Sequence, residues 1–228
     1  MFKIEKILHF QFRFQNLLVW LFLYMIANPL LAFLPHTGLL IQALFTAVLV
    51  SAIYTIHNKN RLKWAALVVL ALTTILLWGN AFGLIQSNAR VIDGLLVLYL
   101  GMMVSSFNRY ILISKQVDME LISAALCLYL LFAMLWASLF TLLEGFMPGS
   151  FAGSGLAQAE TIREYHQYFN YFSFVTITTL GYGDITPQTP LAMTLCQIEA
   201  ILGQFFIAVL VARLVAIQVA QSFIQKEE

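Results

Sequence analysis

Residues 176–184 of the chain read Thr-Ile-Thr-Thr-Leu-Gly-Tyr-Gly-Asp. In this stretch Gly181 and Gly183 alternate with Leu180 and Tyr182. A glycine has no Cβ and adopts a positive φ at little cost, so the alternation allows successive backbone carbonyls to point toward one axis. The side chains of Leu180 and Tyr182 then turn away from that axis. The stretch therefore predicts a loop that presents backbone oxygens.

This loop resembles the selectivity filter of the potassium-channel pore family, in which a helix, a pore helix with a filter loop and a second helix form one quarter of a pore. The resemblance covers residues 119–221 and includes Tyr171-Phe172-Ser173 before the filter and Pro187 after it. In this family, four copies of the loop replace the hydration shell of a K⁺ ion with carbonyl oxygens. The alternative is an ordinary turn between two membrane helices, which the length of the match disfavours.

The resemblance implies a role for each residue of the filter. Thr179 supplies a hydroxyl and a carbonyl at the inner end, where K⁺ leaves the cavity. Leu180, Gly181 and Tyr182 supply the carbonyls of the other K⁺ sites, and Gly183 completes the loop. Leu180 stands where valine or isoleucine is commoner in the family, which changes the packing behind the filter but leaves the carbonyl in place.

A second departure from the family pattern concerns the acid after the filter, Asp184. Some members have a carboxylic acid in the pore helix that pairs with it, whereas this chain has Val175 at that position. We therefore expect the Tyr171 hydroxyl to be the partner of Asp184. Thr176 and Thr178 are expected to support the filter from the pore helix.

The composition is that of a membrane protein: 61% of the residues are hydrophobic and 10% are charged, against about 25% charged in soluble domains. A crossing helix needs about 20 apolar residues, and six runs qualify: 14–34, 38–56, 63–86, 91–112, 120–143 and 190–216. Residues 161–178 are too short for another crossing and predict a re-entrant pore helix. The fold class expected is an all-α membrane protein with six transmembrane helices and a pore helix and filter loop between helices 5 and 6.

We divide the chain into a four-helix transmembrane domain at residues 1–118 and a pore domain at residues 119–228.

Voltage-gated channels also have four helices before the pore. Their fourth helix carries repeated arginines, because one charge that crosses the membrane yields about 2.3 kcal/mol per 100 mV. Here the charges between residues 92 and 111 are Asp93 and Arg109, near opposite ends. We predict weak or no voltage dependence. A scaffold, a site for a lipid or small apolar ligand, and a docking surface for an auxiliary membrane protein remain open as roles of these helices.

The distribution of lysine and arginine predicts the orientation, because loops on the cytoplasmic side carry the excess. With a cytoplasmic N-terminus, two basic residues, Arg90 and Arg163, lie outside. Nine lie inside: Lys3, Lys6, Arg13, Lys59, Arg61, Lys63, Arg109, Lys115 and Lys226. Both termini are then cytoplasmic, and the loop from Glu144 to Ile162, rich in glycine, forms a flexible outer turret. Short loops suggest a prokaryotic inner membrane.

The last helix is expected to begin near Pro190 and to carry the gate. Gly203 either acts as a hinge or allows close packing against the pore helix. Glu199 is expected to form a hydrogen bond behind the filter and to tune it.

Arg213 is the other ionisable residue of the last span. We expect it to pair with Asp118 or Glu120 in the linker before the fifth span, coupling that linker to the gate. The alternative is that its side chain extends to the membrane interface.

One filter loop per chain predicts a homotetramer that conducts K⁺ passively, with K⁺ as permeant ligand and no organic cofactor. The alternatives are a non-conducting modulatory subunit and the membrane component of a potassium uptake transporter.

No enzyme activity is expected, because the chain shows no metal cluster, no nucleophile with a base, and no phosphate loop. Apart from membrane lipid and an auxiliary membrane protein, no partner is indicated, and the net charge of +1 gives no sign of a nucleic-acid surface.

Overall fold

A computed structural model describes residues 13–31, 37–56, 61–85, 87–114, 116–159 and 162–227. The first five helices in it are α2 (Arg13–Leu31), α3 (Thr37–Thr55), α4 (Arg61–Ala81), α5 (Ala89–Ile113) and α6 (Met119–Phe146). They are followed by strand β1 (Phe151–Gly153), a 3-10 turn (Leu156–Gln158), helix α7 (Ile162–Ile177), strand β2 (Ile185–Pro187) and helix α8 (Pro190–Glu227). The protein is thus mainly helical, as predicted.

Within the described residues, five helices are long and apolar enough to cross a membrane: α3, α4, α5, α6 and residues Pro190–Ala220 of α8. Helix α2 is apolar over the shorter stretch Arg13–Ala27, so it does not confirm the predicted first span, part of which lies outside the described residues. Helix α7 has 16 residues, too few to cross a core of about 30 Å at 1.5 Å per residue. Its re-entry into the membrane stays a prediction.

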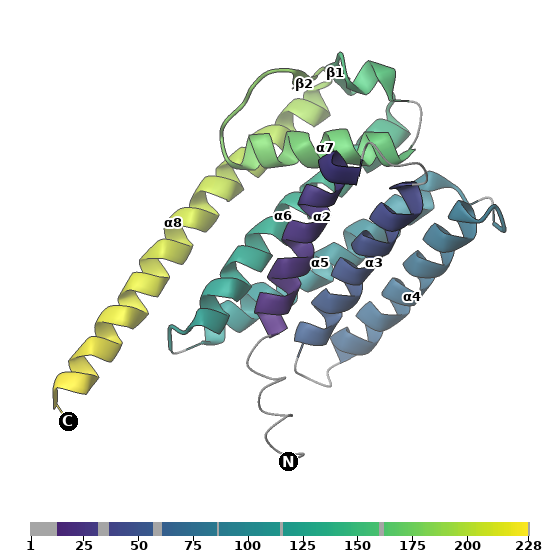
Figure 1. The fold of residues 1–228 in the computed structure, drawn as a ribbon. Helices are drawn as coiled ribbons and strands as arrows, with labels where there is room; N and C mark the ends of the chain where they lie inside the picture. The colour runs from purple at the N-terminus through teal and green to yellow at the C-terminus, as the bar shows by residue number, and fades with distance from the viewer. Residues whose placement is uncertain are drawn as a thin grey trace.

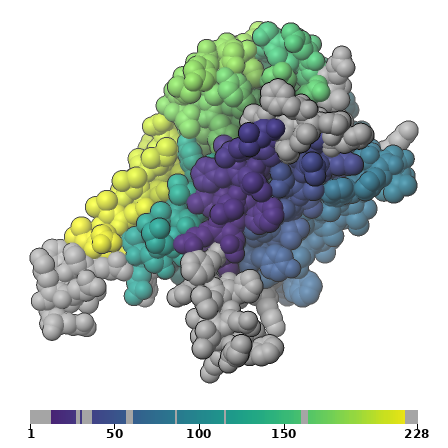
Figure 2. Space-filling view, viewed as in Figure 1, coloured from purple at the N-terminus to yellow at the C-terminus, as the bar shows by residue number. Residues whose placement is uncertain are grey.

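The helices α2 to α6 run side by side, whereas α7 lies across their ends beneath the β1–β2 ribbon (Figure 1). Helix α8 starts at this ribbon and runs along one edge of the molecule (Figures 1 and 2), and most of its side chains are exposed in the single chain. The start of α2 and the end of α8 both lie at the side opposite the ribbon.

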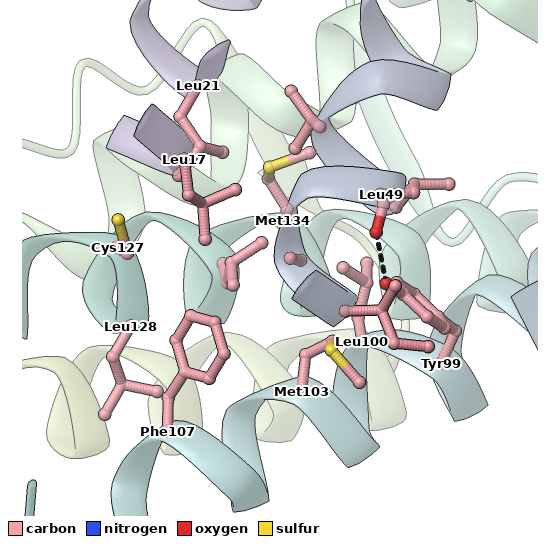
Figure 3. Packing of buried hydrophobic residues seen from close by; sticks show 14 of the residues in the cluster. Leu17, Leu21, Leu49, Tyr99, Leu100, Met103, Phe107, Cys127, Leu128 and Met134 are labelled. Atoms are coloured by element: carbon pink, nitrogen blue, oxygen red, sulfur yellow. Dashed lines mark hydrogen bonds between the residues drawn. The ribbon is translucent and has the colours of Figure 1, made fainter. Parts of the chain in front are cut away.

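One continuous core joins the first helices to α6. It includes Leu17 of α2, Tyr99 and Phe107 of α5, and Leu128 of α6 (Figure 3). The Tyr99 hydroxyl donates a hydrogen bond to the Leu49 carbonyl of α3. Lipid tails are as apolar as these side chains, so close packing and such hydrogen bonds hold the helices together in a membrane. This core contains residues from both sides of residue 118, where the domain boundary stays a prediction.

The loop after α6 is more ordered than the expected turret. Phe151 pairs with Pro187 and Gly153 with Ile185 in an antiparallel ribbon. The Glu144 carboxylate accepts hydrogen bonds from the N–H groups of Gly149 and Phe151 at 2.7 and 3.1 Å. Sequence reasoning missed this ribbon and these hydrogen bonds, because three-residue strands and a carboxylate that binds backbone N–H groups leave no periodic pattern in a sequence. The ribbon fixes the segment that leaves the filter.

Candidate functional site

The backbone between α7 and α8 has an unusual conformation. Thr179, Gly181 and Gly183 have positive φ values of 59°, 57° and 78°, while Leu180 and Tyr182 between them do not. The positive φ predicted for the two glycines is confirmed. Such an alternation is the pattern that turns successive carbonyls the same way. A positive φ at threonine is uncommon, and strain of this kind gathers at functional sites.

The end of α7 holds this loop through backbone hydrogen bonds. The N–H of Thr179 donates to the Thr176 carbonyl at 2.9 Å. The N–H groups of Leu180 and Gly181 donate to the Val175 carbonyl at 2.9 and 3.2 Å. No backbone N–H of the described residues donates to a carbonyl between residues 179 and 182. The loop therefore uses its donors to anchor itself and leaves these oxygens free to bind a cation.

The side chains of the loop are uncovered in the single chain. Leu180 is 56% exposed and Tyr182 is 66% exposed. Thr178, by contrast, turns back to the helix, where its hydroxyl donates to the Phe174 carbonyl at 2.6 Å. A large apolar side chain exposed on each of two alternate residues marks this side of the loop as a contact surface.

Asp184 finds the expected partner. A hydrogen bond with its carboxylate, together with its negative charge, raises the pKa of the Tyr171 hydroxyl. The backbone of Asp184 also lies against β1, because a Cβ on Gly153 would come within 2.7 Å of the Asp184 carbonyl oxygen. Asp184 thus lies between Tyr171 of α7 and the backbone of the ribbon.

Behind the filter, one serine joins three helices. The Ser173 Oγ on α7 lies 2.7 Å from the Ala133 carbonyl oxygen of α6 and 2.5 Å from Oε1 of Glu199 on α8. A carbonyl only accepts, and a hydroxyl has one proton to donate. With the serine proton on Ala133, the contact with Glu199 requires a proton on the carboxyl group. The expected hydrogen bond of the buried Glu199 is present, and its tuning of the filter stays a prediction.

Helix α8 lies directly against the end of α7 at Gly203. A Cβ at this position would lie 2.5 Å from Ile177 Cγ1 and 2.6 Å from the Ile177 carbonyl oxygen. The structure therefore gives Gly203 the packing role, while α8 continues unbroken through it and a hinge stays a prediction. The next residue, Gln204, donates from Nε2 to Thr179 Oγ1 at 3.2 Å. Sequence reasoning missed this contact, although an amide beside a glycine in an apolar helix was a signal for it.

Arg213 does not make the expected ion pair. Its Nε donates to the Ile111 carbonyl at 3.0 Å, and its Nη2 donates to the carbonyls of Leu112 and, at 3.2 Å, Ser114. Pairing with Asp118 or Glu120 is therefore wrong. The last carbonyls of α5 lack helical partners and carry the negative end of the helix dipole, so they attract a guanidinium. The Asp118 carboxylate instead caps α6 by accepting from the N–H of Leu121 at 2.7 Å.

Whether Glu199 carries this proton can be tested by comparing two variants. Glu199→Gln keeps a donor toward Ser173, so we expect its free energy of unfolding in detergent to stay within about 0.5 kcal/mol of the original. Ser173→Ala leaves buried groups unpaired and should cost about 1–3 kcal/mol. Ser105→Ala, at an exposed serine on α5, is the control. If Glu199→Gln costs as much as Ser173→Ala, the contact depends on an ionised carboxylate instead.

The contact of Arg213 with α5 gives a second prediction. Arg213→Gln should lower the free energy of unfolding by about 1.5–3 kcal/mol, the range for hydrogen bonds to a charged group. Arg109→Gln, on the exposed end of α5, should change it by less than about 0.5 kcal/mol. The exchange Asp118→Arg with Arg213→Asp should not restore stability. Recovery in that double variant would reinstate the ion pair.

Comparisons with known proteins agree with this geometry. Residues 124–219 match a family model described as an ion channel. No curated protein and no solved structure matches the chain. The match includes most of α6, the whole of α7 and the filter loop. In α8 it runs from the start of the helix to residue 219. Together with the apolar helices it indicates an integral membrane protein. Residues 124–219 therefore match an ion-channel family, in agreement with the resemblance to the potassium-channel pore family.

Proposed function

We propose that the chain is one subunit of a tetrameric, potassium-selective channel that conducts passively. The observation that carries the proposal is the alternation of positive φ at Thr179, Gly181 and Gly183, with the carbonyls of this loop free of backbone donors. Dehydrating a K⁺ ion requires several oxygens around it at once. One extended loop supplies a single column of oxygens, so four loops around an axis are needed to surround the ion.

The uncovered surface of the single chain supports assembly. Leu180 and Tyr182 are exposed on the filter loop, and Phe205 and Val209 are exposed on α8. In a tetramer, the filter side chains contact neighbouring subunits and the carbonyls face the pore. A non-conducting modulatory subunit, or part of an uptake transporter, has less need of an intact filter loop in every chain.

The charges of α5 support weak voltage dependence. Asp93 is buried near one end of this helix and Arg109 is exposed near the other. A sensor that gates steeply has to move several charges per subunit through the membrane field. We propose that voltage sets the driving force for K⁺ but has little or no effect on opening of the gate. With the filter outside, the start of α2 and the end of α8 lie on the cytoplasmic side of the inner membrane.

Selectivity is tested by the reversal potential of purified protein reconstituted between K⁺ on one side and Na⁺ on the other. We expect a reversal close to the K⁺ limit. In Gly181→Ala it should move toward zero or the current should vanish, because the positive φ of 57° does not suit a Cβ. Gly101→Ala is the matched control: both glycines have open space for a Cβ, but Gly101 lies in α5 without a positive φ.

A non-selective current in the original protein would contradict potassium selectivity. Absence of current in both the original protein and Gly101→Ala would favour the modulatory subunit.

Subunit number is tested by native mass spectrometry of the purified protein in mild detergent. We expect a complex of four times the chain mass of 25.7 kDa. Denaturing detergent should return the mass of one chain, which controls for covalent cross-linking. A dominant monomer or dimer would contradict the proposal, because neither surrounds an ion with one filter loop per chain.

A further inference from the structure

A cavity of about 480 Å³ separates the first helices from α7. Its walls come from α3, α4, α5 and α7, with further residues from α2 and α6. The apolar part of the lining includes Tyr24, Phe45, Leu77, Leu96, Leu100 and Met134. This volume lies within the range of about 300–1,000 Å³ that small-molecule sites occupy. The proposed conduction path does not use this cavity.

The cavity contains a buried carboxylate. Asp93 is only 3% exposed, although it is a potentially charged group on an apolar helix. Its Oδ1 lies 2.8 Å from Nε2 of His166 on α7, but no donor hydrogen is aligned with that oxygen. A buried carboxylate is costly unless a cation and hydrogen bonds compensate for the lost water. The imidazole contact meets this need only in part.

Two further polar groups of the lining are unsatisfied. Among the described residues, no hydrogen-bond partner contacts the buried Nε2 of Gln42 or the buried Oδ1 of Asn170. With Asp93 Oδ1, the cavity thus offers two acceptors, one of them a carboxylate oxygen, and one donor. A ligand that matches the two acceptors brings a hydrogen-bond donor, and the carboxylate favours a donor with a positive charge.

We propose that this cavity binds a small alkylammonium ligand. The ammonium group donates to the acceptors of Asp93 and Asn170, and the alkyl chain packs against Leu77 and Leu96. Tyr24 and Phe45, whose ring centroids lie 5.4 Å apart, add aromatic surface of the kind that favours a cation. A carboxylate or phosphate head group is disfavoured, because Asp93 repels a second negative charge.

Occupancy of this cavity reaches the pore through α7. Asn170 and His166 lie on the helix that anchors the filter, whereas Gln42 and Asp93 lie on helices of the N-terminal half. A bound ammonium therefore bridges the two parts of the chain. This assignment gives the first helices a ligand-binding role, and it does not rest on potassium selectivity.

The test is isothermal titration calorimetry of hexylamine against the purified full-length protein in detergent, with a protein-free detergent blank. We expect saturable binding of one amine per chain. 1-Hexanol and hexanoate, which share the alkyl chain, should bind at least about tenfold more weakly, since a charge-assisted hydrogen bond is lost. Saturable binding of 1-hexanol with the same affinity, or no saturable binding of hexylamine, would overturn the proposal.

Two variants locate the binding. Asp93→Asn keeps the shape of the side chain and removes its charge, so hexylamine affinity should fall by about tenfold or more. Ala81→Trp fills the cavity from α4 and should block binding with Asp93 intact. Glu120→Gln, which removes an acid outside the cavity lining, should bind hexylamine normally. Circular dichroism and size exclusion verify folding, and unchanged affinity in the folded Asp93→Asn and Ala81→Trp variants would refute the site.

Discussion

The close approach of α8 to the end of α7 is the constraint on which the rest of the pore depends. It occurs at Gly203, where any side chain would meet the Ile177 carbonyl. Because α8 comes this near, Gln204 reaches the Thr179 hydroxyl and Glu199 reaches Ser173. The filter loop itself makes few contacts within its own chain, so its shape is set by α7 through the backbone and by α8 from behind.

Much of the fold follows directly from the sequence. Apolar runs located the helices to within about five residues, apart from the end of α8, which continues to Glu227, since a membrane crossing dictates their length. The conformation of the filter loop was predictable because two glycines at alternate positions allow the positive φ values that this loop requires. Tyr171 was expected as the partner of Asp184 because Val175 stands where some family members have a carboxylic acid. In each of these cases, residues that are close in the sequence determine the local conformation or contact.

The predictions failed where a side chain contacts backbone atoms and not another side chain. Arg213 was expected to find a carboxylate, but it binds the carbonyls of Ile111 and Leu112, and backbone acceptors at a helix end carry no sequence signal. Ser173 likewise reaches the Ala133 carbonyl. The β1–β2 ribbon was missed because three residues are too few for a pattern. Where a polar side chain meets distant backbone, tertiary structure decides the contact.

The shared core of α2 to α6 has a consequence for how the protein is made. Helix α5 ends at Ile113 and α6 begins at Met119, and both pack into the same cluster of the same chain. Each chain can therefore complete most of its packing before it meets another copy. Packing of these helices is then a step within one chain that does not depend on chain concentration, whereas association with other chains does. The packing of these helices therefore belongs to the single chain, whatever number of chains assembles afterwards.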